Sequence, residues 1–129
     1  MNFFSTRLTS GQDLKNQIFV FFKSKNISAG LVLSAVGSLK IASLRFADQK
    51  TATTLTGPFE ILSLTGTLAE NGVHLHICIS DQHGKTIGGH LLEGCLIHTT
   101  CELVIVPVLN TIFSREPDPQ TNYMELKIK

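Results

Sequence analysis

The sequence is poor in charged residues, and it lacks a long hydrophobic run. Charged residues make up 16% of the 129 residues and hydrophobic residues 43%, a low charged fraction for a small monomer that must cover its surface with polar groups. We therefore expect some apolar surface to meet another subunit. The most apolar runs, 18–22 and 103–109, are far shorter than the roughly 20 residues of a membrane helix, so no membrane span is predicted.

Cysteine is also scarce. Cys78, Cys95 and Cys101 are odd in number, show no Cys-x-x-Cys spacing and lie inside apolar segments, which argues against a disulfide framework. The first ten residues contain Arg7 but no long apolar core followed by a small-residue cleavage site, so no secretory signal is predicted. A cytoplasmic location is the expectation that fits both observations.

No run of basic residues is present. Eleven Lys and Arg against ten Asp and Glu leave a formal net charge of +1, and the basic residues are scattered along the chain from Arg7 to Lys129. A nonspecific nucleic-acid binder usually concentrates such charge into a patch, so the charge pattern gives no support to DNA binding. The length suits a single domain spanning residues 1–129.

One amphipathic helix is predicted near the N-terminus, over about 11–25. Ser10 followed by Asp13 is typical of a capping box, and apolar residues then recur at helical spacing between positions 14 and 22. Asn26 can leave the helix in a left-handed conformation.

The rest of the chain has the pattern of antiparallel strands. Segments rich in β-branched residues alternate in polarity and are separated by short polar turns. The predicted strands are 27–36, 39–46, 51–55, 59–68, 73–81, 85–97, 101–109 and 123–128, with turns at 37–38, 57–58, 71–72 and 81–85 and an irregular, proline-containing loop at 115–121. The fold class predicted is α+β, a mostly antiparallel β-sheet with one N-terminal amphipathic helix packed on it.

The stretch "HLHICISD" at 74–81 places two imidazoles two residues apart on a half-buried strand. Strand alternation sends His74, His76 and Cys78 to one face and aliphatic residues to the other. If 82–84 is a three-residue hairpin loop with Gly84 in the left-handed position, the register that follows places His90 opposite His76. Directly opposed Cβ atoms lie roughly 5 Å apart, so three imidazoles would converge on one point.

A three-His set is typical of zinc, or another divalent transition metal, held with one coordination position open to water or substrate. Gly88 and Gly89 precede His90 and would let an ion or ligand approach the backbone. The alternative is that these are ordinary histidines on the solvent face of a strand. Cys78 shares that face as a possible fourth ligand or, alternatively, as a small buried hydrophobe.

Three segments carry a family resemblance. The stretches "GPFEILSLTGTL" at 57–68, "HLHICISDQHGKTIGGHLLEGCLIHTTCELVI" at 74–105 and "FSREPDPQTNYMELKI" at 113–128 closely resemble the plant and prokaryote conserved (PPC) domain. The resemblance implies an antiparallel α+β fold that assembles as a homotrimer. It also implies DNA binding, because the plant members accompany AT-hook peptides in nuclear proteins, although the Arg-Gly-Arg-Pro core of an AT-hook is missing here.

The fold that the resemblance implies is also similar to that of acetolactate decarboxylase, in which a His-x-His strand and a third His hold zinc. That arrangement matches the spacing of His74, His76 and His90, which supports a metal site but not the same reaction.

Four charged residues are candidates for chemistry near the histidines. Arg45 and Glu60 are embedded in otherwise apolar strand segments, and each needs a partner or a role. One alternative is an ion pair, Arg45 with Glu60 or with an acid of a neighbouring subunit. In the other, Arg45 binds a substrate carboxylate while Glu60 or Glu93 moves a proton, and Arg115 is a further candidate anion clamp.

Two functions therefore follow from the sequence. The first is a homotrimeric protein with a three-His metal site that binds a small anionic ligand, with lyase or hydrolase chemistry as the form of any activity. The alternative, which rests on the resemblance alone, is a regulatory module that contacts DNA or a transcription factor.

Overall fold

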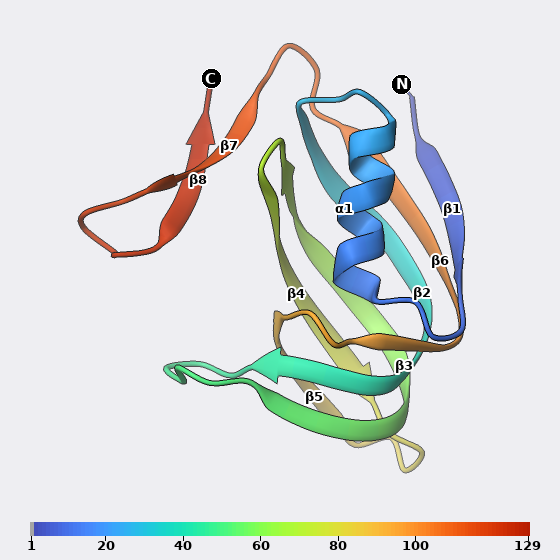
Figure 1. Ribbon diagram of the computed structural model, residues 1–129. Coiled ribbons are helices and arrows are strands. Elements are labelled where there is room, and N and C mark those ends of the chain that lie inside the picture. The colour runs from blue at the N-terminus through green and yellow to red at the C-terminus, as the bar shows by residue number, and fades with distance from the viewer. Residues whose placement is uncertain (1) are drawn as a thin grey trace.

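The computed structural model describes residues 2–129 and confirms an α+β fold that is mostly antiparallel sheet (Figure 1). Six strands form one sheet, and the last two strands form a second, separate hairpin. In chain order the elements are β1 (Phe4–Thr9), α1 (Leu14–Ser24), β2 (Ala29–Arg45), β3 (Thr53–Ala69), β4 (Gly72–Ser80), β5 (Thr86–Leu91), β6 (Leu96–Pro107), β7 (Phe113–Pro117) and β8 (Met124–Ile128).

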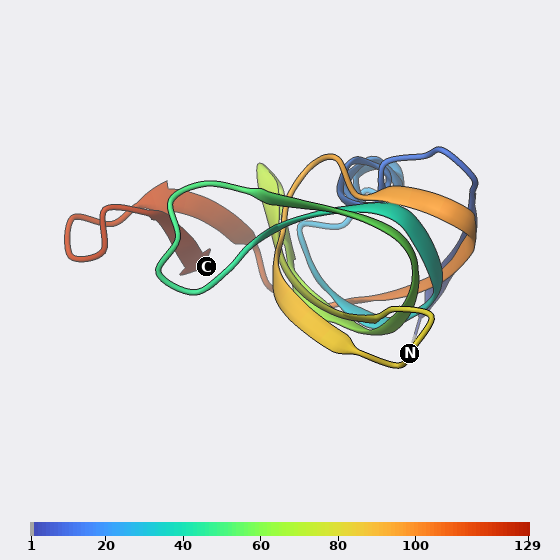
Figure 2. The ribbon, with the colours of Figure 1, turned by 90° about the horizontal axis from the view of Figure 1, so that it is seen from below.

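The large sheet curls until its edge strand β5 meets β2, a strand inside the same sheet. Its strand order is β1-β6-β2-β3-β4-β5, and β5 also pairs with β2 through Leu44–Leu91 and Arg45–His90. Strands β2 to β5 therefore close into a ring at one end of the molecule, which is visible from below (Figure 2). This closure brings the end of β2 beside the end of β5.

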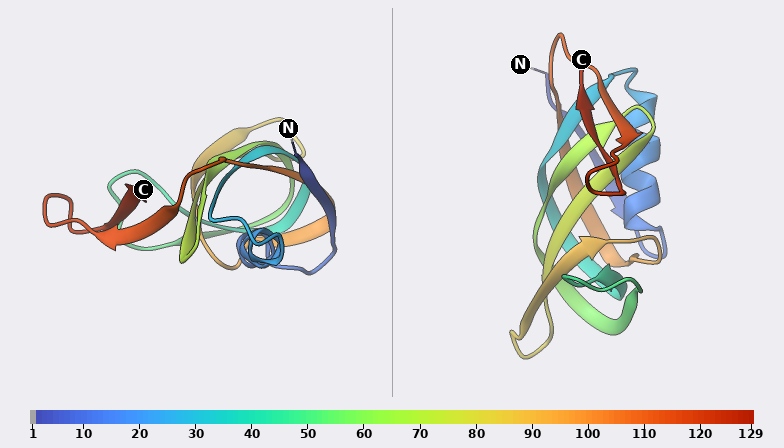
Figure 3. Two further views of the ribbon diagram at one scale, coloured as in Figure 1. Left: turned by 90° about the horizontal axis from the view of Figure 1, so that it is seen from above. Right: turned by 90° about the vertical axis from the view of Figure 1, so that its left-hand side faces the viewer.

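Helix α1 covers the open side of the curled sheet (Figure 3). Leu14, Ile18 and Phe22, spaced four residues apart on one face, are each 0% exposed. Burial of each such side chain contributes roughly 1.5–3 kcal/mol, so this face fixes the helix to the sheet. Within residues 2–129 no helix is both long and apolar enough to cross a membrane.

The helix begins three residues later than predicted, and its cap is Asp13 and not Ser10. The carboxylate of Asp13 accepts a hydrogen bond from the backbone N–H of Asn16 at 3.0 Å, and its other oxygen accepts one from the N–H of Gly94 at 2.6 Å. One side chain thus caps the helix and ties it to the turn before β6. The predicted left-handed residue is confirmed, because Asn26 has a φ of 55°.

Two predicted turns are wrong, because 37–38 and 57–58 lie inside the 17-residue strands β2 and β3. A Cβ at Gly37 would lie 2.1 Å from the carbonyl oxygen of Thr100 on β6, so this glycine permits the close approach of two strands. Conversely, the single strand predicted over 85–97 is divided into β5 and β6 by a turn in which Gly94 has a φ of +96°.

Strands β1 and β7 were not predicted. The segment 115–121, predicted to be irregular, begins with the last residues of β7. Pro117 fits there because β7 belongs to a two-stranded hairpin and ends at that residue. The β7–β8 hairpin projects from the main body (Figure 1), and its root is held by a small cluster of Ala29, Ala69 and Phe113.

Candidate metal centre and ligand pocket

The register predicted for the β4–β5 hairpin is confirmed. Asp81 N–H donates to the carbonyl of Lys85 at 3.0 Å, Gly84 has a φ of +78°, and His76 lies directly opposite His90. His74 lies two residues before His76 on the same face of β4. The two strands therefore bring three imidazoles together.

The three imidazoles form a group that could hold one metal ion. Their ring centroids are 4.9 Å (His74–His76), 4.9 Å (His74–His90) and 5.6 Å (His76–His90) apart. The Nε2 atoms of His74 and His76 are separated by 3.2 Å, and one nitrogen from each ring lies within 4.8 Å of the others. Tetrahedral zinc with Zn–N bonds of about 2.0–2.1 Å places its nitrogen donors about 3.3 Å apart, so the donor set fits such an ion.

Protonation of His74 and of His90 is disfavoured. Burial, together with the nearby charges of His74 and Arg45, lowers the pKa of His90 to about 4, and burial followed by the charge of Arg115 lowers the pKa of His74. The Nδ1 atom of His90 is buried and has no hydrogen-bond partner among residues 2–129. Neutral imidazole is the form that binds a metal, so the lowered pKa of His74 and of His90 favours the form that a metal would require.

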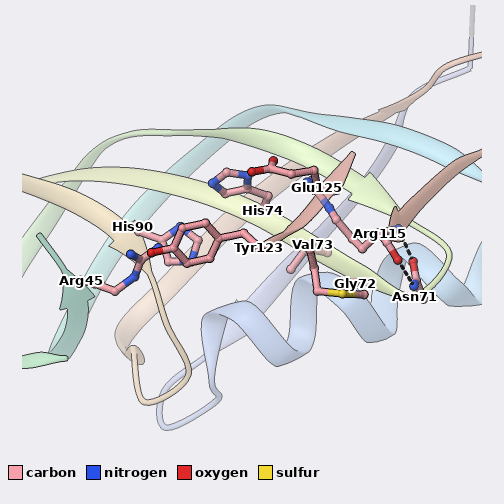
Figure 4. A pocket seen from close by; sticks show the side chains of 10 residues that line it. Arg45, Asn71, Gly72, Val73, His74, His90, Arg115, Tyr123 and Glu125 are labelled. Atoms are coloured by element: carbon pink, nitrogen blue, oxygen red, sulfur yellow. Dashed lines mark hydrogen bonds between the residues drawn. The ribbon is translucent and has the colours of Figure 1, made fainter. Parts of the chain in front are cut away.

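A cavity of about 510 Å³ opens beside His74 and His90 (Figure 4). Arg45 and Arg115 line it from β2 and β7, and Tyr123, which lies just before β8, lines it next to Arg45. The guanidinium carbon of Arg45 lies 5.9 Å from the centre of the Tyr123 ring, a cation–π distance. The cavity thus combines histidines, two cations and an aromatic ring.

Arg115 is the more buried of the two cations. It is 8% exposed, its Nη2 donates to the hydroxyl of Thr67, and its Nε has no partner within the described chain. Burial lowers the pKa of Arg115 below its ordinary value.

The backbone of Arg115 is fixed by the β3–β4 turn. Its N–H donates to Asn71 Oδ1 at 2.7 Å, and its carbonyl accepts from Asn71 Nδ2 at 2.9 Å. Asn71 directly precedes β4, the strand that carries His74. The turn therefore holds the projecting hairpin in place at the edge of the cavity.

The other two predicted acid–base candidates lie elsewhere. Glu60 is exposed on β3 opposite Ser38 and Ser80, and Glu93 is exposed in the turn between β5 and β6. The suggested Arg45–Glu60 ion pair is not formed; the ion pair found among residues 2–129 joins Lys129 to Glu116 at 2.9 Å. Of the four candidates, Arg45 and Arg115 line the cavity beside the histidines.

Gly88 and Gly89 line a second cavity of about 330 Å³, together with His76, His90 and Asp48. The close packing of the strands gives a further reason for glycine at both positions. A Cβ at Gly88 would lie 2.8 Å from the carbonyl oxygen of Ile77, and one at Gly89 would lie 3.0 Å from that of Arg45. These glycines let β5 pack against β4 and β2 at once.

The cysteines do not join the three-His group. Cys78 is a half-buried free thiol on the histidine face of β4, and the metal-compatible group contains the three histidines only. Burial raises the pKa of Cys95 and of Cys101 to about 11, so both stay protonated thiols.

Glu125 and Tyr123 line the cavity but were not predicted as site residues. Figure 4 shows the carboxylate of Glu125 beside the imidazole of His74. Burial lowers the pKa of both His74 and Arg115, and the charge of Glu125 partly opposes this lowering. No local motif marks these residues, because they reach the cavity only through the docking of the β7–β8 hairpin.

The model of the Plants and Prokaryotes Conserved (PCC) domain, the same family as the PPC domain that the sequence resembles, matches residues 1–109, well over half of the chain. The chain belongs to the PCC domain family. The matched range includes all three histidines and Arg45 but ends before the hairpin that carries Arg115 and Glu125.

A PCC-like segment also occurs in a much longer protein. "Bifunctional protein GlmU" from Synechococcus sp. (strain JA-3-3Ab) is 51% identical over 123 residues, which are 95% of this chain and 20% of that protein. This chain therefore spans about a fifth of the length of that relative.

Solved structures share the fold over nearly the whole chain. A hypothetical protein from Salmonella enterica is 41% identical with a TM-score of 0.94, covering 99% of this chain and 93% of that one. A metal-containing protein from Archaeoglobus fulgidus is 30% identical with a TM-score of 0.82, covering 97% and 92%. A Bacteroides thetaiotaomicron protein, for which DNA binding is itself only proposed, is 22% identical with a TM-score of 0.82, covering 99% and 91%, and shows the fold alone.

Proposed function

We propose that the protein binds a divalent transition metal, zinc by preference, through His74, His76 and His90, and that the metal centre takes a small anionic ligand from the adjoining cavity. The observation that carries the proposal is the convergence of three ring nitrogens within 4.8 Å of one another. Three protein ligands leave a coordination position open, as in catalytic and not structural zinc sites. The metal-containing relative from Archaeoglobus fulgidus supports the proposal.

The bound metal would supply Lewis acidity toward a ligand oxygen, and any activity would be of the lyase or hydrolase class. Within the chain itself, Arg45 and Arg115 bind and orient the anionic group of the ligand. Glu125 is the carboxylate that lines the same cavity, next to His74, and it accepts or donates a proton there.

Metal analysis of the purified protein is the direct test. We expect about one zinc per chain in the native protein. His76→Ala should lower the affinity for zinc by at least about 100-fold, because two imidazoles hold zinc poorly. His83→Ala is the matched control, since His83 is exposed in the β4–β5 turn. Metal at background level in the native protein, or equal retention by both variants, contradicts the proposal.

We further propose that the protein assembles as a homotrimer. Large apolar side chains are exposed on the outer surface of the long strands, with Leu33 at 55%, Val36 at 59% and Leu62 at 55% exposure. Such side chains gathered on paired strands are typical of a subunit interface.

DNA binding is the second proposal, motivated by membership of the family, whose plant members accompany AT-hook peptides in nuclear proteins. Titration with random-sequence duplex at about 50 mM and about 200 mM salt tests it, because phosphate contacts give an affinity that falls steeply as salt rises. Undetectable binding at the lower salt contradicts direct DNA binding and leaves the metal proposal intact.

A further inference from the structure

Two guanidinium groups flank the histidine cluster from different elements. Arg45 ends β2 and lies directly opposite His90 in the pairing that closes the sheet. Arg115 donates to the hydroxyl of Thr67, which is the cross-strand partner of His74. Figure 4 shows the two arginines at opposite ends of the cavity, with the histidines between them.

The charge of Arg115 is not balanced by an ion pair within the described chain. The side chain is 8% exposed and its Nε, although buried, donates to nothing in residues 2–129. Burial disfavours the charged form of Arg115 and the charge of Glu125 only partly opposes this, so an acidic group in the cavity would stabilise the guanidinium. The hydroxyl of Thr67 accepts one hydrogen bond from the guanidinium of Arg115, which has five N–H donors.

Arg45 is likewise available to a ligand. It is half-buried, forms no ion pair within the described part of the chain, and faces the ring of Tyr123. An aromatic ring orients a guanidinium without neutralising its charge. The acidic residue that lines the same cavity is Glu125, so one negative charge faces two positive ones before any metal is counted.

We infer that the cavity takes a short organic di-acid, with one acidic group at Arg115, the other at Arg45 and the connecting carbons across the histidine cluster. This inference rests on the proposed function in that the ligand is a small anion at the histidine site. It specifies two acidic groups where that proposal requires one. A volume of about 510 Å³ accommodates such a molecule, and each planar guanidinium matches a carboxylate through two parallel hydrogen bonds.

Calorimetric titration with succinate and with butyrate tests this, since the two acids have the same number of carbons and differ in the second carboxylate. The titrations use the protein as purified and the same protein after chelation, with zinc content measured in parallel. We expect succinate to bind at least about tenfold more tightly than butyrate, because losing one charged hydrogen-bonded pair costs about 1.5–3 kcal/mol. We expect that preference to persist after chelation, because both guanidinium groups belong to the chain.

Variants test whether the preference for succinate over butyrate depends on Arg45 and Arg115. Arg45→Met and Arg115→Met should each bring the two affinities within about threefold of each other while zinc content stays native, since neither residue is among the three ligands. Arg7→Met, which removes an exposed arginine on β1, is the matched control and should keep the preference. Arg45 is the less buried arginine, so its variant remains informative if Arg115→Met does not fold.

Equal affinity for the two acids in the native protein overturns the di-acid inference, and so does an unchanged preference in Arg45→Met. Neither result affects the metal proposal, which is tested separately by the zinc content of the native protein and of the His76→Ala and His83→Ala variants. If the native protein prefers succinate but binds no zinc, the di-acid inference stands and the metal proposal is rejected.

Discussion

His90 on β5 has two cross-strand partners, His76 on β4 and Arg45 on β2. One residue thus joins the metal-compatible cluster to the strand pairing that closes the sheet. Burial of part of its ring is the largest reason why its pKa falls to about 4, and the neighbouring His74, Arg45 and His76 lower the pKa further. Protonation of His90 therefore opposes both metal binding and folding.

We predict that metal-free protein loses stability as the pH falls from about 6.5 toward 4. The unfolded chain takes up a proton at His90 near its ordinary pKa of 6.5, whereas the folded chain does so only near 4, so acid favours unfolding within that window. After allowance for the partial solvent exposure of the ring, the loss is about 1–2 kcal/mol. Urea unfolding at several pH values in the presence of a chelator measures it.

His90→Gln should flatten this pH dependence, because glutamine does not titrate. His83→Gln, in the exposed hairpin turn, should leave it unchanged. A native protein whose stability does not fall between the two pH limits contradicts the prediction.

The histidine register could be predicted from the sequence because both of its determinants are local. Strand alternation fixes which residues share a face, and the turn chemistry of Asp81 and Gly84 fixes which residue of β5 opposes His76. Short-range rules of this kind need no knowledge of the tertiary fold.

The cavity wall could not be predicted for the opposite reason. Arg115 and Glu125 reach the histidines through the docking of a hairpin that begins more than 30 residues after β4 ends, and the decisive contact is with Asn71 in a distant turn. The predictions of turns at 37–38 and 57–58 are wrong for the same reason, because packing against distant strands overrides the local sequence pattern. Gly37 is typical of a turn locally, but its role is to admit β6.

Asp13 and Ser10 provide a direct comparison of the observed and the predicted helix cap. Asp13→Ala should destabilise the protein by about 1–3 kcal/mol, because it removes the acceptor for the N–H groups of both Asn16 and Gly94. Ser10→Ala should change stability by less than about 0.5 kcal/mol, because Ser10 is exposed and lies outside the helix. Thermal or urea unfolding of the two variants decides between the caps, and equal effects would contradict this assignment.

The proposed homotrimer predicts a mass of three times the 14.1 kDa of one chain. Val36→Glu places a charge on the exposed apolar surface of β2 and should shift the protein toward the single-chain mass, because an unpaired charge in an interface is strongly unfavourable. Val20→Glu is the matched control: Val20 is 58% exposed on the outer side of α1, away from that surface. Light scattering after gel filtration gives both masses, and a native protein that runs as a single chain rejects the trimer.

Asn71 should control the hairpin without touching the histidines. Asn71→Ala removes both hydrogen bonds to the backbone of Arg115, so the amides of 113–117 should exchange with solvent about 10-fold or more faster, equivalent to a loss of more than about 1.4 kcal/mol in local stability. Zinc binding should remain native, because the three ligands lie on β4 and β5. Asn16→Ala, on the exposed face of α1, is the control and should leave hairpin exchange unchanged. If Asn71→Ala leaves exchange in β7 unaltered, the hairpin is held by its apolar root of Ala29, Ala69 and Phe113 and not by the turn.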